Sequence, residues 1–286
     1  MTPYTPTRTS FAGDDPLHPH APLNEDKGHD MGILEGKNIL VAGVTHHTSI
    51  AYAVARIAQQ EGATVLVSNF GRALSLTNRV VQKLDPVPPV LELDVTNDEH
   101  LAALPDAVRE HVDHLDGVVH SIAFANPQTA LGGNFLSTGW DDVATSLRVS
   151  AYSLASLTMA CKPLFAETAS VVGLTFDATV SWPAYDWMGV SKSALESTSR
   201  YLARYLGKEG VRSNIVAAGP LATIAKKAIP GSSSFDDVWA ERAPLGWEPT
   251  DTTPTAKAVV ALLSDWFPAT TGEVIHVDGG LHSTGA

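Results

Sequence analysis

The chain has 286 residues, of which 44% are hydrophobic and 17% charged, a composition typical of a globular protein with a sizeable core. Lys and Arg number 19 against 31 Asp and Glu, and the net charge of −12 argues against nucleic acid or an anionic membrane surface as a main partner. A single cysteine, Cys161, excludes an intramolecular disulfide and a multi-cysteine zinc site, and we expect no metal. No apolar run approaches the ~18 residues of a membrane span, so we expect a cytoplasmic protein.

Residues 1–32 are rich in proline and show no apolar periodicity, so we interpret them as a flexible polar leader. The segment does not resemble a secretory signal, because no apolar stretch follows a basic start. We interpret its histidines, His18, His20 and His29, as solvated, since nothing in the sequence fixes their geometry for a metal. Residues 33–286 are then expected to form a single domain.

Short β-branched apolar runs alternate with segments of helical spacing from Lys37 onward. The predicted strands are residues 38–44, 64–68, 90–94, 116–122, 170–174, 212–218 and 273–277. These runs are apolar throughout rather than alternating, which indicates strands buried on both faces of a sheet. The sequence therefore predicts an α/β, Rossmann-type doubly wound fold with a seven-stranded parallel sheet and helices on both faces. In such a fold ligands bind at the carboxyl ends of the strands.

The first predicted strand ends at Gly43, and a short turn leads through Ser49 and Ala51 into a helix. A dinucleotide fold needs small residues here, so that the backbone can approach a pyrophosphate. Because Gly43 is the one glycine of this turn, the G-x-G-x-x-G fingerprint is absent, and any other strand-turn-helix remains an alternative. His46 and His47 are neighbours in sequence and point different ways, which argues against a shared metal.

Residues 69–72, after the second predicted strand, stand where dinucleotide folds discriminate the adenosine ribose. They contain no acidic residue and one basic residue, Arg72, so they do not decide between NADH and NADPH. A single cation for a 2′-phosphate favours NADH, with NADPH possible. After the third predicted strand, Asp94 either contacts adenine or caps the helix expected near Asn97.

Tyr185 and Lys192 stand seven residues apart in the helix predicted to start at Pro183. Seven residues make about two turns, which returns to the same helical face within ~20°, so both side chains are expected to project together. Taken alone, this spacing leaves open a surface helix with an unrelated tyrosine and lysine.

Together these motifs resemble those of the NAD(P)H-dependent enoyl-acyl-carrier-protein reductases of the short-chain dehydrogenase/reductase superfamily, especially the actinobacterial branch that includes the target of isoniazid. The resemblance spans residues 34–282. It rests on Gly43-x5-Ser49-x-Ala51, residues 91–95, 116–125 and 150–153, Tyr185-x6-Lys192 with residues 193–196, and residues 210–214, 217–220, 262–266, 271–273 and 277–280.

The resemblance implies a role for each matching residue. The implied catalytic residues are Tyr185, Lys192 and Phe176. The implied cofactor-binding residues are Gly43, Ser49, Ile50, Phe70, Asp94, Val95, Ser121, Ile122, Ala123, Leu174, Lys192, Ala218, Gly219, Pro220, Leu221 and Thr223. The implied substrate-binding residues are Phe124, Phe176, Tyr185 and Met188. Tyr185 would donate to the substrate carbonyl, and Lys192 would hold the nicotinamide ribose and lower the tyrosine pKa.

The implied reaction is hydride transfer from NADH to the β-carbon of a trans-2-enoyl thioester in fatty acid elongation. The thioester is carried by acyl carrier protein or coenzyme A, and the implied assembly is a homotetramer. The substrate-binding loop would be residues 222–247. This segment is shorter than in the long-chain mycobacterial branch, so we expect medium-chain substrates.

Two other functions remain to be weighed against this one. A 3-oxoacyl reductase of the same superfamily would carry its lysine where Gly189 stands, and a serine among residues 174–176. A non-catalytic dinucleotide-binding sensor would be expected to have lost Tyr185 or Lys192, and both are present.

Overall fold

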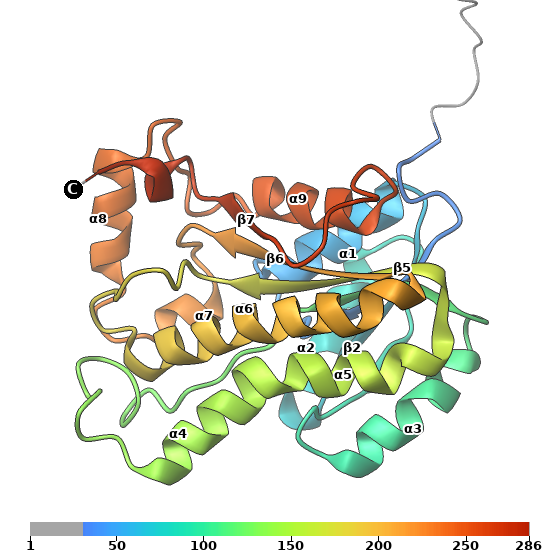
Figure 1. Ribbon diagram of the computed structural model, residues 1–286, viewed down its shortest axis with the longest axis horizontal. Helices are drawn as coiled ribbons and strands as arrows, with labels where there is room; N and C mark the ends of the chain where they lie inside the picture. Colours follow the sequence, from blue (N-terminus) through green and yellow to red (C-terminus); the bar gives the residue numbers. More distant parts are fainter. Residues whose placement is uncertain (1–30, 286) are drawn as a thin grey trace, which may run out of the picture. The chain divides into compact units, whose positions relative to one another are not determined.

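The computed structural model describes residues 31–285, and the chain from Met31 onward forms one compact unit. The predicted leader with its three histidines lies outside the described residues, apart from Met31 and Gly32. The described part of the chain is built around one parallel sheet (Figure 1).

Seven strands form this sheet, which confirms the predicted fold class. They are β1 (Asn38–Ala42), β2 (Thr64–Asn69), β3 (Val90–Glu92), β4 (Leu115–His120), β5 (Phe165–Thr175), β6 (Val211–Ala218) and β7 (Val274–Val277). Their order is β3-β2-β1-β4-β5-β6-β7, and every neighbouring pair is parallel. Strand order reverses between β1 and β4, and a crevice at the carboxyl ends of these two strands is where such folds bind ligands.

The strand ends differ from the sequence prediction in a way that shapes this crevice. β1 and β4 stop before the predicted residues, because the chain leaves the sheet at Gly43 and at Ser121. β5 starts well before its predicted first residue, because Phe165 already pairs with Leu115 before a shift in register. The apolar pattern of these segments continues past the point where their backbones diverge, so it could not reveal the true ends.

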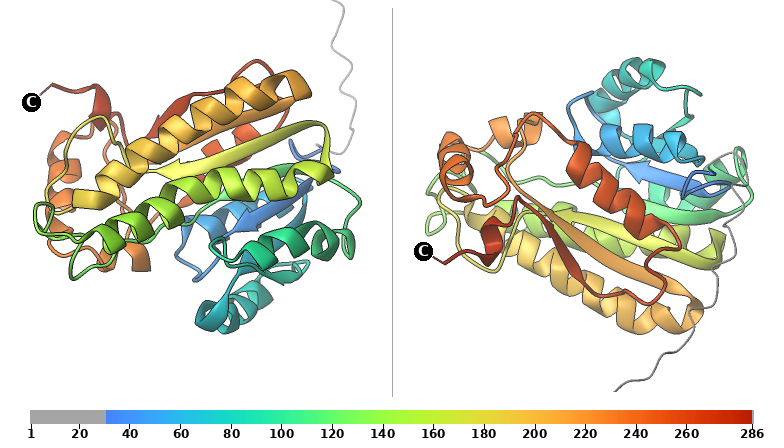
Figure 2. Two further views of the ribbon diagram at one scale, coloured as in Figure 1. Left: turned by 60° about the horizontal axis from the view of Figure 1, so that its bottom comes forward. Right: turned by 90° about the horizontal axis from the view of Figure 1, so that it is seen from above.

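Helices cover both faces of the sheet (Figures 1 and 2). They are α1 (Ile50–Gln60), α2 (Gly71–Val80), α3 (Asp98–Arg109), α4 (Trp140–Leu147), α5 (Ser153–Cys161), α6 (Asp186–Leu206), α7 (Ile224–Lys227), α8 (Ser233–Arg242) and α9 (Thr253–Leu263). On one face α1 packs against α9, and on the other α5 lies between α3 and α6. None of the helices in residues 31–285 is long and apolar enough to span a bilayer.

Side chains of β1 show how the sheet is buried on both faces. Ile39 and Val41 belong to the core shared with α1 and α9, whereas Leu40 and Ala42 belong to the core shared with α3 and α5. All four are completely buried. Burial of each larger aliphatic side chain contributes about 1.5–3 kcal/mol, so the ends of the central strands are held firmly in place.

Candidate active site

A cleft of about 420 Å³ opens at the carboxyl ends of β1, β4, β5 and β6. Its walls include Gly43 after β1, Ser121 after β4, Phe176 after β5 and Gly219 after β6. α7 and Phe235 of α8 border it on the remaining side. The cleft therefore lies at the strand-order reversal, where the sequence prediction placed a ligand.

Two glycines allow chain segments to meet at the base of this cleft. Gly43 has a φ of +96°, in the left-handed region, and a Cβ here would lie 2.2 Å from the Ser121 carbonyl oxygen. A Cβ on Gly219 would lie 2.8 Å from the Trp239 indole nitrogen and 2.8 Å from a ring carbon of Trp247. Any larger residue at either position would push these segments apart.

Ser49 fixes the start of α1 at the edge of the cleft. Its hydroxyl accepts a hydrogen bond from the Tyr52 N–H (3.2 Å) and donates one to the His46 carbonyl (2.7 Å). Ile50, the first residue of the helix, consequently lines the cleft. The amino end of a helix carries partial positive charge and unpaired N–H groups, so this end of the cleft suits a phosphate.

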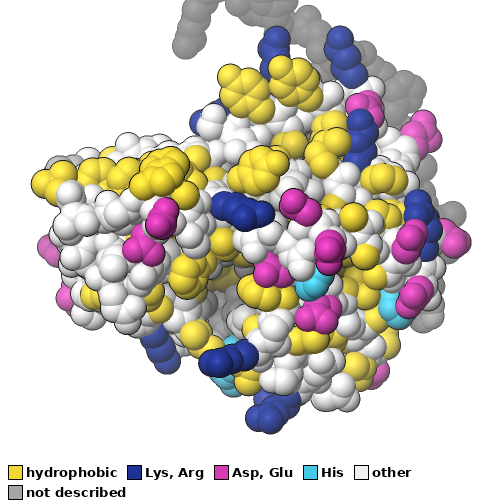
Figure 3. All heavy atoms as spheres, turned by 90° about the horizontal axis from the view of Figure 1, so that it is seen from below, with side chains coloured by type: hydrophobic (Ala, Val, Ile, Leu, Met, Phe, Trp, Pro, Cys, Tyr) yellow, Lys and Arg dark blue, Asp and Glu magenta, His cyan; other side chains and the backbone are white. Residues whose placement is uncertain are grey.

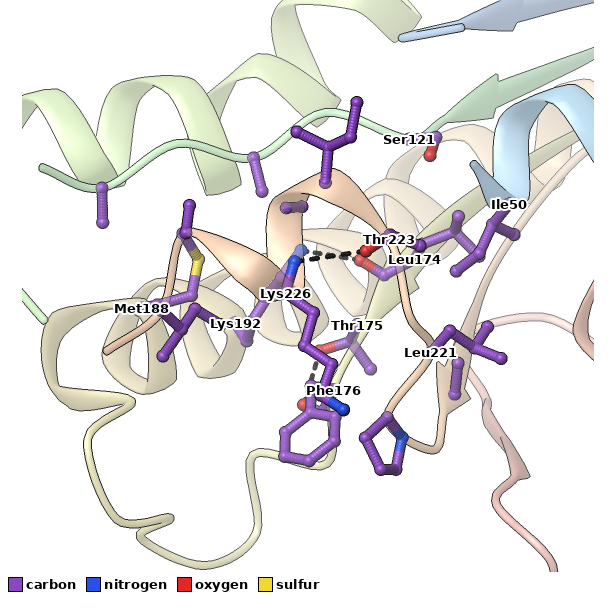
Figure 4. Close-up of a pocket in the computed structure, with 18 of the residues that line it drawn as sticks. Ile50, Ser121, Leu174, Thr175, Phe176, Met188, Lys192, Leu221, Thr223 and Lys226 are labelled. Carbon is purple, nitrogen blue, oxygen red and sulfur yellow. Dashed lines mark hydrogen bonds between the residues drawn. The ribbon is translucent and has the colours of Figure 1, made fainter. Parts of the chain in front are cut away.

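Lys192 is buried in α6 and faces the cleft. Its ammonium donates one hydrogen bond, 2.8 Å long, to the Leu174 carbonyl (Figure 4). Burial lowers the pKa of Lys192 to about 8, and the nearby Glu196 carboxylate only partly offsets this effect. An ammonium has three N–H donors, so Lys192 can hold a ligand hydroxyl as well as the Leu174 carbonyl.

Tyr185 stands on a tight turn directly before α6, which begins at Asp186 rather than at Pro183. Both of its neighbours, Ala184 and Asp186, have positive φ, at 62° and 42°. The Asp186 carboxylate compensates by accepting hydrogen bonds from the N–H groups of Gly133 (2.7 Å) and Asn134 (2.9 Å). Such backbone costs about 1–3 kcal/mol per residue and occurs mainly where function requires a particular side-chain position.

Aromatic rings surround the Tyr185 phenol. Its ring lies 5.2 Å from that of Phe176, which in turn lies 5.5 Å from the rings of Phe235 and Trp239. This burial raises the pKa of Tyr185 above its ordinary value. Desolvation of the phenol thus outweighs the expected lowering of this pKa by Lys192.

The predicted substrate-binding loop, residues 222–247, contains two helices, α7 and α8. We call this segment the lid. The Trp239 indole N–H donates to the Asp278 carbonyl (3.0 Å), and the Trp247 indole N–H donates to the Pro220 carbonyl (2.8 Å). Trp239 is 1% exposed, so the lid is tied to the sheet by buried aromatic side chains as well as by the chain itself.

Most of the residues singled out in the sequence line the cleft (Figure 4). Tyr185 and Lys192 both do, although Tyr185 stands on the turn before α6 and not within the helix that carries Lys192. The others are Gly43, Ile50, Ser121, Ile122, Ala123, Phe124, Leu174, Phe176, Met188, Ala218, Gly219, Pro220, Leu221 and Thr223.

Four of the predicted residues do not line this cleft: Ser49, Phe70, Asp94 and Val95. Phe70 follows β2 and is 44% exposed, while Val95 is buried in the core. Asp94 accepts two hydrogen bonds from Thr96, and the cap of α3 is Asn97. The alternative that Asp94 caps this helix is therefore wrong.

Several cleft residues were missed by the sequence analysis. Thr45 and Ala125 lie within motifs that it recognised, Gly43-x5-Ser49 and residues 116–125, but they were given no role there. Ile229, Phe235 and Lys226 come from the lid. No periodicity marks lid residues as facing the cleft, because α7 and α8 are short and their direction is set by tertiary packing.

The surface charges, the groups of metal-ligating side chains and the single cysteine bear on which ligands and reactions the described part of the chain can support. On the face drawn in Figure 3, acidic and basic side chains are mixed with hydrophobic ones, and no continuous basic surface is seen there. Within residues 31–285 no group of three or more His, Cys, Asp or Glu side chains could hold a metal ion. Cys161 is buried, and burial raises its pKa to about 12, so it is not a reactive thiol.

The cleft thus combines a helix amino end, a buried ammonium and a phenol at the reversal point of a doubly wound sheet. This combination defines a dinucleotide-dependent oxidoreductase of the short-chain dehydrogenase/reductase class.

Comparison with known proteins gives the family. Residues 43–282 match the family described as "Enoyl-(Acyl carrier protein) reductase". The chain is 48% identical over 263 residues to the "Enoyl-[acyl-carrier-protein] reductase [NADH]" of Mycolicibacterium smegmatis, covering 87% of this chain and 97% of that protein. It is 44% identical over 263 residues to the Mycobacterium avium protein of the same name, with the same coverage. It is 37% identical over 256 residues to "Enoyl-[acyl-carrier-protein] reductase [NADH] FabI" of Bacillus subtilis, covering 88% and 98%.

The chain therefore belongs to the enoyl-acyl-carrier-protein reductase family. The resemblance inferred from the sequence motifs is confirmed.

Proposed function

We propose that this protein uses NADH to reduce the carbon–carbon double bond of trans-2-enoyl thioesters in fatty acid elongation. One observation carries the proposal: in a chain of this family, Tyr185 and Lys192 line the same cleft at the strand-order reversal. The similar proteins from Mycolicibacterium smegmatis and Mycobacterium avium are named for NADH, which supports NADH as the cofactor here.

The donors of the cleft fit a reduced nicotinamide dinucleotide. Lys192 has N–H groups beyond the one bonded to the Leu174 carbonyl, and these suit the ribose hydroxyls. The amino end of α1 and the small residues Gly43 and Gly219 suit the pyrophosphate. When bound, the nicotinamide supplies the hydride that is added to the β-carbon of the substrate.

Tyr185 acts on the opposite end of the conjugated system. Adding hydride to the β-carbon drives negative charge onto the thioester oxygen, so a donor at that oxygen is strongest in the transition state. The phenol of Tyr185 is protonated at neutral pH, as a donor must be, because its ordinary pKa already lies well above 7 and burial raises it further. Phe176 and Met188 line the cleft beside it and exclude water from the developing charge. The α-carbon then takes up a proton to complete the saturated thioester.

The remaining cofactor contacts are proposed from the family motif. Ser49 holds the pyrophosphate turn, Phe70 flanks the adenosine ribose, and Asp94 and Val95 contact adenine. These residues follow β1, β2 and β3 in the chain, and these three strands are neighbours in the sheet. Because Arg72 is the single base among residues 69–72, NADPH is expected to bind more weakly than NADH.

The decisive experiment is a cofactor-oxidation assay with NADH and NADPH against matched enoyl and 3-oxo thioesters, each on coenzyme A and on acyl carrier protein. We expect NADH oxidation with the enoyl substrates, and large losses in Tyr185→Phe and Lys192→Ala. Turnover of the 3-oxo substrates alone would show that the protein is a ketoreductase. Such an enzyme would be expected to carry a lysine at the position of Gly189. No turnover with any substrate, although NADH binds, would show a sensor.

We propose that the protein acts in the cytoplasm as a homotetramer. Support for self-association comes from exposed aromatic side chains on α6: Tyr201 and Tyr205 are 60% and 70% exposed, and their rings stack 6.5 Å apart. Large exposed apolar groups on neighbouring helix turns are typical of an interface. Light scattering coupled to size exclusion tests the assembly, and a monomeric mass would contradict it.

A further inference from the structure

The cleft contains a second charged side chain that the proposed reaction does not use. Two of its lining residues carry a charge, Lys192 and Lys226. Lys226 belongs to α7 of the lid (Figure 4). Its side chain is only 12% exposed. Apart from Thr223, the other lid residues of this wall, which include Ile224, Ala228 and Ile229, are apolar. An ammonium that has lost much of its contact with water on such a wall is costly unless it is paired.

Its partner lies on the other helix of the lid. The Lys226 ammonium forms an ion pair with the carboxylate of Asp236, in the first turn of α8. Asp236 directly follows Phe235, whose ring lines the cleft and lies 5.5 Å from the ring of Phe176. The ion pair therefore bridges α7 and α8 beside the aromatic wall against which an acyl chain would pack.

We infer that the Lys226–Asp236 ion pair sets the length of acyl chain that the cleft accepts. This inference rests on the proposed reduction of enoyl thioesters. A short chain ends among Phe176, Met188 and Phe235 and leaves the ions in contact with water. A long apolar chain must continue between α7 and α8 and cover the pair, which removes water from both charges without giving them a new polar partner. The substrate class is therefore short-chain and medium-chain enoyl thioesters.

The test compares variants that remove or keep the charge of Lys226 while keeping a long side chain. Lys226→Met retains an unbranched stem and removes the ammonium, and Lys226→Arg retains the charge. Lys227→Met is the matched control, because Lys227 is the next residue of the same helix, is exposed and does not line the cleft. For each protein, kcat/KM is measured with NADH and the four-carbon, eight-carbon, twelve-carbon and sixteen-carbon enoyl-coenzyme A thioesters.

We expect the double variant Lys226→Met/Asp236→Leu, which removes both charges, to raise the ratio of kcat/KM for the twelve-carbon over the four-carbon substrate by roughly tenfold, the discrimination typical of apolar pockets. Lys226→Arg and Lys227→Met should keep the parent ratio. Lys226→Met alone should raise the ratio less than the double variant, because it leaves the Asp236 carboxylate without its partner.

Three outcomes would overturn the inference. An unchanged ratio in Lys226→Met/Asp236→Leu, with normal turnover, would show that the ion pair does not limit chain length. An equal loss of kcat/KM at every chain length would instead show that Lys226 contacts the part of the substrate common to all thioesters. A parent enzyme that already prefers the sixteen-carbon substrate would contradict the inferred limit on acyl-chain length. By contrast, no turnover of any enoyl thioester by the parent would refute the proposed function.

Discussion

The two sides of the cleft are built in different ways. The side formed by the ends of β1, β4, β5 and β6 is continuous with the buried sheet, and its key groups are held by backbone atoms: Gly43 against the Ser121 carbonyl, and Lys192 on the Leu174 carbonyl. The lid is joined by backbone hydrogen bonds only near its two ends, from Ala222 to Pro249 and from Leu245 to Gly279, and is otherwise held by side chains, through the indoles of Trp239 and Trp247 and the Lys226–Asp236 pair.

The free energy needed to move the strand ends therefore differs from the free energy needed to open the lid. Moving the strand ends would break buried backbone pairing of the central sheet, so that side can present donors with fixed geometry. Opening the lid costs a few side-chain contacts, so it can admit substrates of different shape. We therefore expect changes at the strand side to alter kcat and cofactor affinity, and changes at the lid to alter KM and substrate choice.

The largest expected effect is that of Lys192→Ala. It removes the ammonium from the strand side and leaves the Leu174 carbonyl without its donor. We expect kcat/KM to fall by about 10³-fold, since it loses both ligand positioning and charge stabilisation. The Kd for NADH, measured by fluorescence titration, should rise as well. An unchanged Kd together with near-normal kcat/KM would show that Lys192 serves only the fold.

The same side chain predicts a pH dependence. Burial lowers the pKa of Lys192 to about 8 from its ordinary 10.5, so the free enzyme loses this proton as the pH rises through about 8. NADH affinity should weaken across that pH, because the neutral amine donates fewer hydrogen bonds. Stability should change in the opposite direction. Between about pH 8 and 10.5 the unfolded chain binds this proton and the folded chain does not, so the contribution of Lys192 to the free energy of unfolding rises with pH. Fluorescence titration and urea unfolding across this range measure the two effects separately.

Tyr185→Phe should have the next largest effect. It removes one hydrogen-bond donor at the developing charge, for which losses of about 10²-fold in kcat are typical. Because the ring remains and still packs on Phe176, NADH affinity and the melting temperature should stay near those of the parent. Steady-state kinetics and thermal unfolding check this. A melting temperature lowered in parallel with kcat would mean that the phenol is structural.

The fold could be predicted from the sequence because its signal is local and repeated. Every predicted strand overlaps a strand of the sheet, since continuous runs such as residues 38–42 can be satisfied only in a sheet buried on both faces. The Tyr185 and Lys192 pair was only partly predictable, because α6 begins at Asp186 and helical spacing alone does not place the Tyr185 side chain.

What the sequence could not reveal depends on contacts between distant segments. The turn that carries Tyr185 has positive φ at Ala184 and Asp186, residues that rarely adopt it, and it is held by N–H groups from Gly133 and Asn134, more than fifty residues earlier. From the sequence, Lys226 would be predicted to be an ordinary surface residue, because only the structure shows that Asp236 of α8 lies beside it. The effect of burial on the Tyr185 pKa also required the surrounding rings to be placed.

Asp186 offers a way to disturb the strand side without touching the reacting groups. Asp186→Ala removes the acceptor of two N–H groups and places a residue without a side-chain acceptor at a φ of 42°. We expect kcat to fall by about tenfold, because the Tyr185 phenol loses its fixed position. Asp186→Asn keeps an amide oxygen as acceptor and tolerates positive φ, so it should retain most of the activity. Equal losses in both variants would indicate that the carboxylate charge, not the turn, is what matters.

The smallest effect, and the sharpest test of the comparison, is expected at the lid. Trp239→Phe keeps an aromatic ring at a fully buried site but removes the donor to the Asp278 carbonyl. Losing one such hydrogen bond costs about 1–3 kcal/mol, and because Asp278 lies outside the cleft, this cost should appear as a looser lid. KM for the enoyl substrate should rise several-fold, while kcat and the Kd for NADH stay near their parent values. Steady-state kinetics with fluorescence titration distinguishes the two sides: a rise in the NADH Kd as large as that in KM would mean that the lid and the strand ends act as one rigid unit.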